Sequence, residues 1–198
     1  MTTTHEGMHT YPRTVKVGSR EVTFRFAELR DRDAVVAMAR SLPEHDLLFL
    51  ARDITQPTNV EEWISNENIN TLLAFGGDEV LGYAAIHRNQ MQWSSHVAEL
   101  RVMVGETMRG QGLGRILTQE AFAFALSQGI EKMVAQMTLD QKGAIAVFEG
   151  IGFRAEALLR DHVKDRSGQK HDLLMLSHEV ARFESQRVAF GVAEAFGG

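Results

Sequence analysis

The stretch from Val97 to Gln128 constrains the fold most, because its hydrophobic period changes once, at a run rich in glycine. Every second residue from Ala98 to Val104 is apolar and falls on one face, which predicts a strand. From Leu113 onward the apolar residues recur at helical spacing, and Gly129 supplies a residue suited to a helix end. The stretch therefore predicts a strand, a glycine-rich turn and a helix.

The turn spans Arg109 to Gly114 and has the sequence Arg-Gly-Gln-Gly-Leu-Gly. Its glycines let main-chain amides converge on a ligand, and the helix that follows adds partial positive charge. These features predict an anion site, most naturally for phosphate, flanked by Arg109 and Arg115. A P-loop is excluded because no Gly-Lys-Ser/Thr closes the run, and a dinucleotide fingerprint is excluded because Arg115 or Leu117 stands where its third glycine belongs.

The run from Arg109 to Gly114 resembles the Q/R-x-x-G-x-G/A signature of the GNAT superfamily of N-acetyltransferases, which binds the pyrophosphate of acetyl-CoA. Ala98, Glu99, Leu100 and Val104 resemble the strand that precedes this signature in the family, which begins A-E-L and has a valine near its end. Residues 141–153 are similar to a second family block, N-x-x-A-I-x-L-Y-E-x-x-G-F, at the expected distance. The resemblance covers roughly residues 22–177.

The resemblance implies an α/β GNAT fold, in which a central mixed, splayed sheet of about seven strands is flanked by about four helices. It also implies acetyl-CoA as the cosubstrate, bound by main-chain groups of the strand and the turn and by the second block. The residues implied in this binding are Val102, Met103, Val104, Arg109, Gly110, Gln111, Gly112, Leu113, Gly114, Arg115, Gln141, Ala144 and Phe148.

The implied reaction moves an acetyl group from a thioester to an amine, which attacks as the free base. A lysine-like amine with a pKa near 10.4 must lose its proton at pH 7, at a cost of roughly 4.6 kcal/mol. In several GNAT enzymes the glutamate at the place of Glu99 is the general base, so the resemblance implies this role here. The residues leave a second interpretation open, in which Glu99 pairs with Arg101 on the same strand face or faces solvent.

Two positions depart from the family pattern. Phe148 occupies the place of a tyrosine that often protonates the departing thiolate, and it has no proton to give. Gln141 occupies the place of a common asparagine and keeps the amide. Two alternatives follow. The thiolate leaves without a protein acid, which is feasible for a thiol with a pKa near 8.5, or another group or a water protonates it.

The acceptor stays open between a protein lysine or N-terminus, a small amine or amino acid derivative, and no acceptor at all in a non-catalytic acyl-CoA sensor. Arg25, residues 30–33 and residues 41–44 look similar to the GNAT domain of bacterial protein lysine acetyltransferases. A formal net charge of −5 makes a cationic acceptor electrostatically reasonable.

Composition narrows the class of protein further. The net charge of −5 gives no overall attraction to nucleic acid, and no run approaches the length of a membrane span. The N-terminus lacks the regions of a signal peptide and the chain has no cysteine, so we expect a cytoplasmic protein without disulfides. We assign no metal site, because His162, His171 and His178 fit a solvated hairpin better than zinc ligation.

The expected organisation is a loose N-terminal tail (1–12), one GNAT domain (13–178) and a helical C-terminal tail (179–198). This last tail would pack on the domain, form a subunit contact in a homodimer, or fray. Asp31 is the expected cap of a helix that ends near Pro43, and Asn59 of another through Ile64. Further elements are expected as strands at 15–17, 22–26, 71–75, 80–87, 132–137, 153–159 and 172–177, and a helix at 142–149 ended by Gly150.

Overall fold

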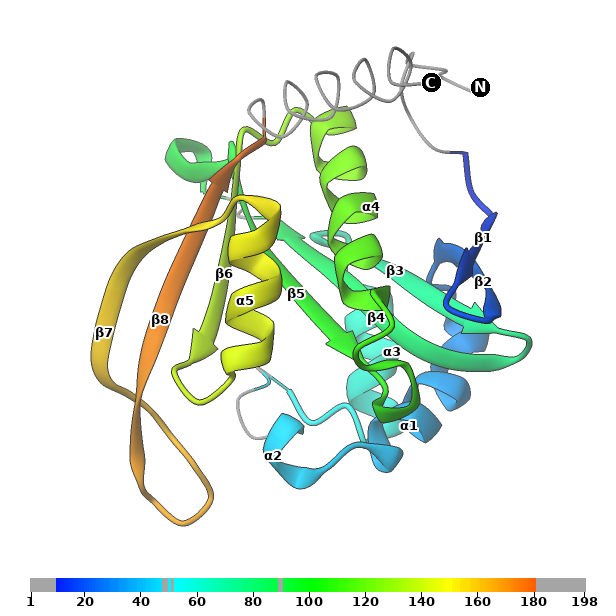
Figure 1. The fold of residues 1–198 in the computed structure, drawn as a ribbon, viewed down its shortest axis with the longest axis horizontal. Coiled ribbons are helices and arrows are strands. Elements are labelled where there is room, and N and C mark those ends of the chain that lie inside the picture. Colours follow the sequence, from blue (N-terminus) through cyan, green and yellow to red (C-terminus); the bar gives the residue numbers. More distant parts are fainter. Residues whose placement is uncertain (1–9, 48–49, 51, 89–90, 181–198) are drawn as a thin grey trace.

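The computed structural model describes residues 10–47, 50, 52–88 and 91–180. In these ranges the chain forms one sheet of eight strands, in the spatial order β1-β2-β3-β4-β5-β6-β8-β7 (Figure 1). The strands are β1 (Arg13–Val17), β2 (Arg20–Phe26), β3 (Ile69–Gly76), β4 (Glu79–Arg88), β5 (Val97–Val104), β6 (Lys132–Thr138), β7 (Arg154–Lys164) and β8 (Lys170–Glu179). The helices are α1 (Arg32–Ser41), the single turn α2 (Glu44–Leu47), α3 (Pro57–Ile64), α4 (Leu113–Ser127) and α5 (Lys142–Ile151).

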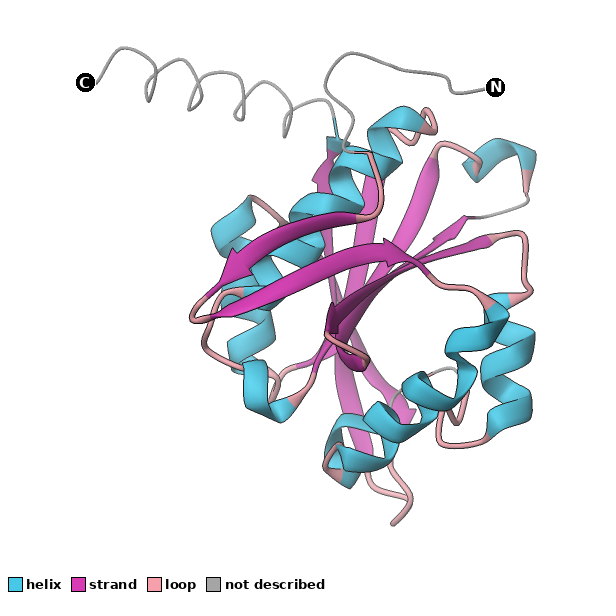
Figure 2. Cartoon of the chain, turned by 90° about the vertical axis from the view of Figure 1, so that its right-hand side faces the viewer, coloured by secondary structure: helices cyan, strands magenta, loops and turns pink. Residues whose placement is uncertain are grey.

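Helices cover both faces of the sheet, so the molecule has three layers (Figure 1; Figure 2). On one face α4 and α5 enclose a buried cluster that includes Leu117 of α4 and Leu100 of β5. On the other face α1 and α3 enclose a second cluster that includes Val36 and Trp63. Burial of these apolar side chains on both faces drives the assembly of the layers.

The sheet is splayed between β5 and β6. The antiparallel pairing of β5 with β4 covers seven residue pairs, from Ala98 to Val104 along β5. The parallel pairing of β5 with β6 covers three pairs and ends where Glu99 lies opposite Val134. The last five residues of β5 therefore face an opening in the sheet, which confirms the expected mixed and splayed architecture, with eight strands in place of about seven.

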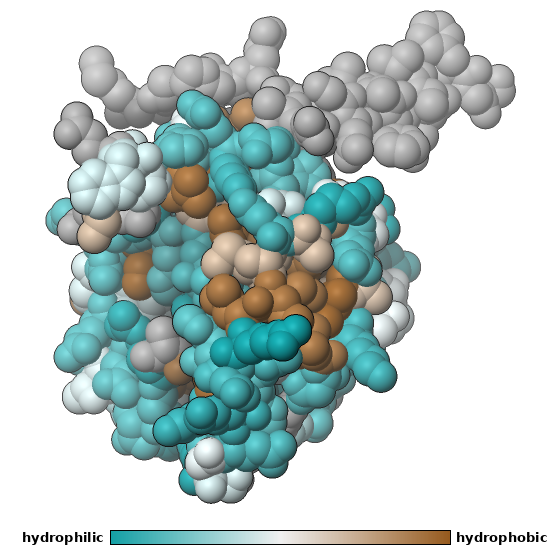
Figure 3. All heavy atoms as spheres, turned by 90° about the vertical axis from the view of Figure 1, so that its left-hand side faces the viewer, coloured by the Kyte–Doolittle hydropathy of each residue, from teal (hydrophilic) through white to brown (hydrophobic). Residues whose placement is uncertain are grey.

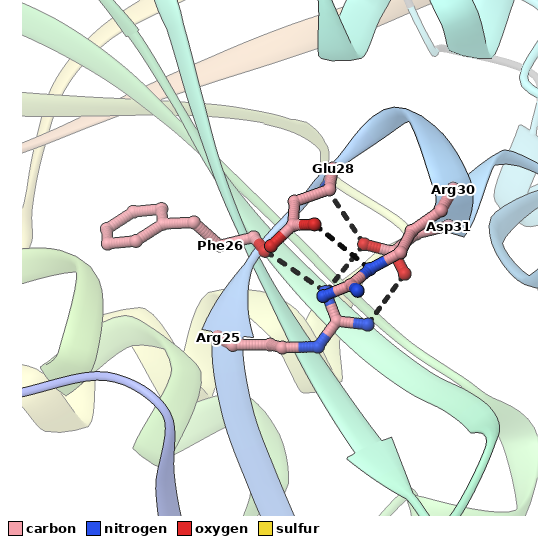
Figure 4. A network of polar contacts seen from close by, with 5 residues as sticks. All are labelled: Arg25, Phe26, Glu28, Arg30 and Asp31. Carbon is pink, nitrogen blue, oxygen red and sulfur yellow. Dashed lines mark hydrogen bonds and ion pairs between the residues drawn. The ribbon is translucent and has the colours of Figure 1, made fainter.

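A polar network fixes the connection from β2 into α1 (Figure 4). Both terminal nitrogens of Arg25 donate to the carboxylate of Asp31 at 2.6 Å, and the Glu28 N–H donates to the same carboxylate at 2.8 Å. Asp31 is the N-cap of α1, as expected, but its carboxylate makes no capping bond to that helix because it serves this network instead. The arginine and aspartate of the opening segment therefore have a structural role, and the segment gives no independent sign of the acceptor.

Two expected helix boundaries are wrong. α3 begins at Pro57, which suits the first helical position, and the side chain of Asn59 donates to the carbonyl of Asp53 instead of capping. α5 continues past Gly150 and ends at Gly152, which has a φ of +112°. A helix ends readily where a glycine takes up the left-handed conformation, and of the two glycines only the second does so.

Both predicted tails lie largely outside the described residues. Of residues 1–12, only residues 10–12 are described, and the Tyr11 hydroxyl donates to Glu120 of α4 at 2.7 Å. Of residues 179–198, Glu179 ends β8 and the side chain of Val180 is buried. The predicted helical structure of residues 181–198 falls outside the described ranges.

The surface carries apolar side chains on the side of the molecule where β7 forms the sheet edge (Figure 3). Large apolar residues that are exposed in the described ranges include Leu158 of β7 and Val147 of α5. Among the described helices, none combines the length and the apolar character that crossing a membrane requires.

Candidate active site

The site is organised by the alternation of side chains along β5. Glu99, Arg101 and Met103 project from the face that α1 and α3 cover, whereas Leu100 packs with α4 on the other face. Glu99 belongs to the last residue pair before β5 and β6 separate. The carboxylate predicted as the base therefore lies beside the opening of the sheet.

Glu99 also makes the contact that the second interpretation of the sequence described. The Nε of Arg101 donates to the Glu99 carboxylate at 2.7 Å. Both side chains keep about a quarter of their surface exposed, at 28% for Glu99 and 27% for Arg101. The ion pair is thus open to solvent and uses only one of the guanidinium nitrogens of Arg101, which leaves the two terminal NH₂ groups for another anion.

Main-chain groups of β5 line the opening. The Gly105 N–H bonds to the carbonyl of Leu81 at 2.8 Å, which continues the β4–β5 ladder. Because alternate residues of an antiparallel strand direct their main-chain groups at the same neighbour, Met103 directs its N–H and C=O toward β4. Val102 and Val104 direct theirs toward the opening. Of the three strand residues predicted to line a ligand with main-chain groups, the alternation thus favours two.

The glycine turn presents an uncapped helix start. Gly112 is the N-cap of α4, its φ is +86°, and no side chain caps the helix or places an acid in its first turn. The first bond of the helix runs from the Ile116 N–H to the Gly112 carbonyl, so the N–H groups of Leu113, Gly114 and Arg115 have no helical partner. A Cβ added at Gly112 would meet no described atom within 4 Å. Free amides, partial positive charge and open space fit a phosphate group here.

The side chains of the turn have separate roles. The Leu113 side chain is fully buried, so only its main chain faces the turn. Arg109 forms an ion pair with Asp46 of α2, and its Nε lies 3.4 Å from the Val104 carbonyl. Gln111 and Arg115 are exposed, as is Gly110, and the Gln111 amide donates to the Thr107 carbonyl at 2.7 Å. The arginine at the start of the turn thus links the turn to α2.

The three residues of the second block that are predicted to bind acetyl-CoA lie in different surroundings. Gln141 is half-buried and its Oε1 accepts the Thr138 N–H at 3.0 Å, so its amide holds the end of β6. Ala144 is exposed on the first turn of α5. Phe148 is 5% exposed and its ring stacks edge-on against Phe153 at 4.8 Å. This phenylalanine is therefore a core residue in the described structure.

A pocket opens on the face that carries Glu99. Its floor is formed by Tyr83, Ala85 and His87 of β4 with Arg101 of β5, and the side chains of Leu50, Arg52, Ile54 and Trp63 form its walls. His87 lies directly opposite Glu99 in the β4–β5 register. The enclosed space is about 20 Å³, room for one water-sized group such as an amine.

Charges around this pocket shift the pKa of His87. Burial first of all, then the charge of Arg101 and to a smaller extent that of Arg52, lowers the pKa of His87 to about 4, against the opposing effect of Glu99. Burial also raises the pKa of Tyr83 to about 12. Both groups are consequently neutral near pH 7, and the formal charges of the pocket come from the two arginines and the glutamate.

Sequence reasoning missed His87 and Arg52. The strand that carries His87 was expected, but the connection from β4 to β5 is too long to set the register that pairs His87 with Glu99. Arg52 lies in a segment without hydrophobic period, which gives no sign of what it faces.

Comparisons with known proteins agree with this geometry. The model of the acetyltransferase (GNAT) family matches residues 36–153. A Bacillus subtilis (strain 168) protein named "Putative phosphinothricin acetyltransferase YwnH" is 29% identical over 164 residues, which cover 81% of this chain and all of that protein.

Solved structures share the fold. A ribosomal-protein-alanine N-acetyltransferase from Brucella melitensis superposes with a TM-score of 0.71 at 24% identity, over 79% of this chain and 98% of that one. The structure of yncA from Salmonella typhimurium, solved with its cofactor acetyl-CoA, has a TM-score of 0.71 at 21% identity, over 80% of this chain and 94% of that one. With the family model matching more than half of its residues, the chain belongs to the GNAT family of acetyltransferases, which use acetyl-CoA as the acetyl donor.

Proposed function

We propose that this enzyme acetylates the primary amine of a small molecule that also carries an anionic group, and that Glu99 is the general base. The observation that carries the proposal is the position of Glu99 beside the opening of the sheet and beside a pocket lined by two arginines. A zwitterionic acceptor fits these charges, because its ammonium group is attracted by Glu99 and its anion by Arg52 and Arg101.

The name of the Bacillus subtilis relative supports a small acceptor of this class. Phosphinothricin, in the name of the Bacillus subtilis relative, is an amino acid analogue with acidic groups besides its amine. A lysine side chain on a protein carries no anion of its own, so two arginines at the pocket wall disfavour it. The protein-lysine and N-terminus acceptors considered from the sequence are therefore the second candidates.

In the proposed reaction, acetyl-CoA supplies the activated acetyl group and the chain's own residues bind, orient and deprotonate. The uncapped start of α4 holds the pyrophosphate, and the N–H groups of Val102 and Val104 face the opening, where they can donate to a developing oxyanion. Glu99 accepts the amine proton, directly or through a water, which offsets the cost of forming the free amine. Phe148 has no proton to give, and we propose that the thiolate leaves without a protein acid.

Glu99→Gln tests this proposal, because it keeps the size of the side chain and removes the base. We expect kcat to fall by roughly 10²- to 10⁴-fold while the Kd for acetyl-CoA, measured by calorimetry, changes less than about twofold. Glu79→Gln is the matched control, since the Glu79 side chain is 65% exposed at the far end of β4, and it should leave both constants unchanged.

The acceptor is identified with a panel of three classes: amino acids and their phosphinate analogues, amines without an anion such as polyamines, and lysine-containing peptides with an intact protein. The proposal predicts the highest kcat/KM for the first class. A preference for the peptides and protein would establish the second candidate instead. If the wild type binds acetyl-CoA but never accelerates thioester cleavage with any class, the chain is a non-catalytic acyl-CoA sensor.

The homodimer expected from the sequence stays a prediction.

A further inference from the structure

His87, on the face opposite α4, is a polar side chain that the proposed chemistry has not used. His87 lies directly across from Glu99 on the antiparallel pair of β4 and β5, where opposing Cβ atoms are about 5 Å apart. Its ring lines the same pocket as Arg52 and Arg101. We propose that His87 is the second amine-binding residue of the acceptor pocket, where its neutral imidazole accepts a hydrogen bond from the acceptor amine beside Glu99.

The charges of the pocket give the imidazole this role. An ammonium or amine group is a donor, so it needs acceptors, and Glu99 is the one carboxylate close by on β5. Arg52 and Arg101 cannot accept a hydrogen bond and repel a cation. Within the described ranges, no hydrogen bond joins the His87 ring to another residue, which leaves a ring nitrogen able to accept. His87 therefore adds the acceptor that this side of the pocket otherwise lacks.

The charged groups that face His87 act on its pKa in opposite directions. Arg101 from β5 and Arg52 from the pocket wall disfavour the imidazolium, Glu99 favours it, and Tyr83 on the same strand is uncharged near pH 7. Burial has the largest effect and the arginines add to it, so the pKa of His87 is about 4. An imidazole with the ordinary pKa near 6.5 would be partly cationic at pH 6 to 7 and would repel an incoming ammonium group. The low pKa keeps the acceptor function over the whole neutral range.

The inference rests on the proposed function in that it assumes an amine acceptor, and it assigns a residue that recognises the amine. Two substitutions test it by steady-state kinetics with the best amino acid acceptor. In His87→Leu, which removes the acceptor atom, we expect KM for the amine to rise about 10- to 100-fold while KM for acetyl-CoA is unchanged. In His87→Gln, which restores an acceptor oxygen, we expect most of this loss to be recovered. His162→Leu, on an exposed position of β7, is the matched control.

A binding measurement separates this inference from the proposed function. In the wild type, the His87 imidazole is followed by NMR with ¹⁵N-labelled histidine and assigned from the resonance missing in His87→Gln. The resonance should stay in the neutral form from pH 8 down to about pH 5. It should shift when the amino acid is added and stay in place with the same compound lacking its amine.

Equal KM values in wild type and His87→Leu, or a ring resonance that the amine leaves in place, would overturn the role of His87. Loss of activity in Glu99→Gln would still support the proposed function in that case. Should His87→Leu fail to fold, the wild-type titration and His87→Gln decide the question by themselves.

Discussion

Gly112 combines a left-handed backbone conformation with open space beside it. Its φ of +86° lies in the left-handed region, where a side chain is strained, and the space beside it is open. Other turn glycines, such as Gly77, share both properties, so what distinguishes Gly112 is that the uncapped start of α4 follows it. A six-residue motif in the sequence predicted this position, because the backbone requirement is local.

Gly112→Asp is expected to abolish acetyl-CoA binding, because it places a carboxylate and a Cβ where the pyrophosphate is proposed to lie. Calorimetry should show the loss of a micromolar Kd, a change of at least about 100-fold. Gly77→Asp is the matched control, since Gly77 has a φ of +67° and the same open surroundings in the β3–β4 turn. If both variants bound acetyl-CoA like the wild type, the turn would not be the pyrophosphate site.

Glu99 and His87 show what a local motif does not predict about single residues. The motif places Glu99 on the strand and alternation puts Arg101 on the same face, but the neighbour His87 follows from the pairing of two strands. The sequence left the pairing of Glu99 with Arg101 as one of two interpretations, and the structure contains that pair without excluding the catalytic role. A residue's chemical type is encoded locally, while the groups that tune it are brought together by folding.

At the scale of elements, the N-terminal strand is fastened to the central helix. Glu120 of α4 is 1% exposed and accepts hydrogen bonds from the Tyr11 hydroxyl and the Arg13 guanidinium. A buried carboxylate is tolerated because both partners satisfy it. Burial, and then the hydrogen bond to Glu120, raises the pKa of Tyr11 well above its usual value, which keeps the hydroxyl a donor. The helical periodicity of the apolar residues does not predict this contact, because Glu120 is polar.

Tyr11→Phe should therefore destabilise the fold by about 1.5–3 kcal/mol, the usual contribution of a hydrogen bond to a charged partner. Urea denaturation at pH 7 measures the change. Tyr83→Phe is the control, since the Tyr83 side chain is also a tyrosine packed in the interior but donates to no described residue, and it should cost less than about 0.5 kcal/mol. Equal losses in the two variants would show that β1 is not held through Glu120.

At the scale of the whole molecule, the splay lies between the turn proposed to hold the pyrophosphate and the pocket proposed to hold the acceptor. The glycine turn and α4 lie on one face and the arginine-lined pocket on the other. The sheet opens between β5 and β6 because their parallel pairing stops after three residue pairs. A ligand that enters from the side of α4 can thus present its reactive end to the pocket across the sheet.

The free energy of unfolding should fall in acid partly because His87 is buried in the pocket. The pKa of His87 is about 4 in the folded chain and near 6.5 in the unfolded chain, so between these pH values the unfolded state binds the extra proton. Stability is therefore lost as the pH falls from about 6.5 to 4, by about 2 kcal/mol once partial exposure is allowed for. Urea denaturation from pH 7 to pH 4 should show a shallower loss in His87→Gln than in wild type.

His162→Gln, exposed on β7, controls for a change in total histidine content and should lose stability as the wild type does. His178, whose pKa is lowered first of all by burial, adds a loss of the same sign in all three proteins. Parallel curves for wild type and His87→Gln would contradict a low pKa at this residue.

The sequence by itself determined the strand, turn and helix from Val97 to Gly129, the alternation of side chains on β5 and the family, because period and backbone conformation are set by neighbours along the chain. It placed the elements within a few residues and erred at Asn59 and Gly150, where a proline and a later glycine decide the helix ends. Only the tertiary structure decided at which residue the two strands separate, after Glu99, and formed the pocket that brings Arg52, His87 and Arg101 together. These contacts join residues that are distant along the chain, and their register depends on packing of both faces at once.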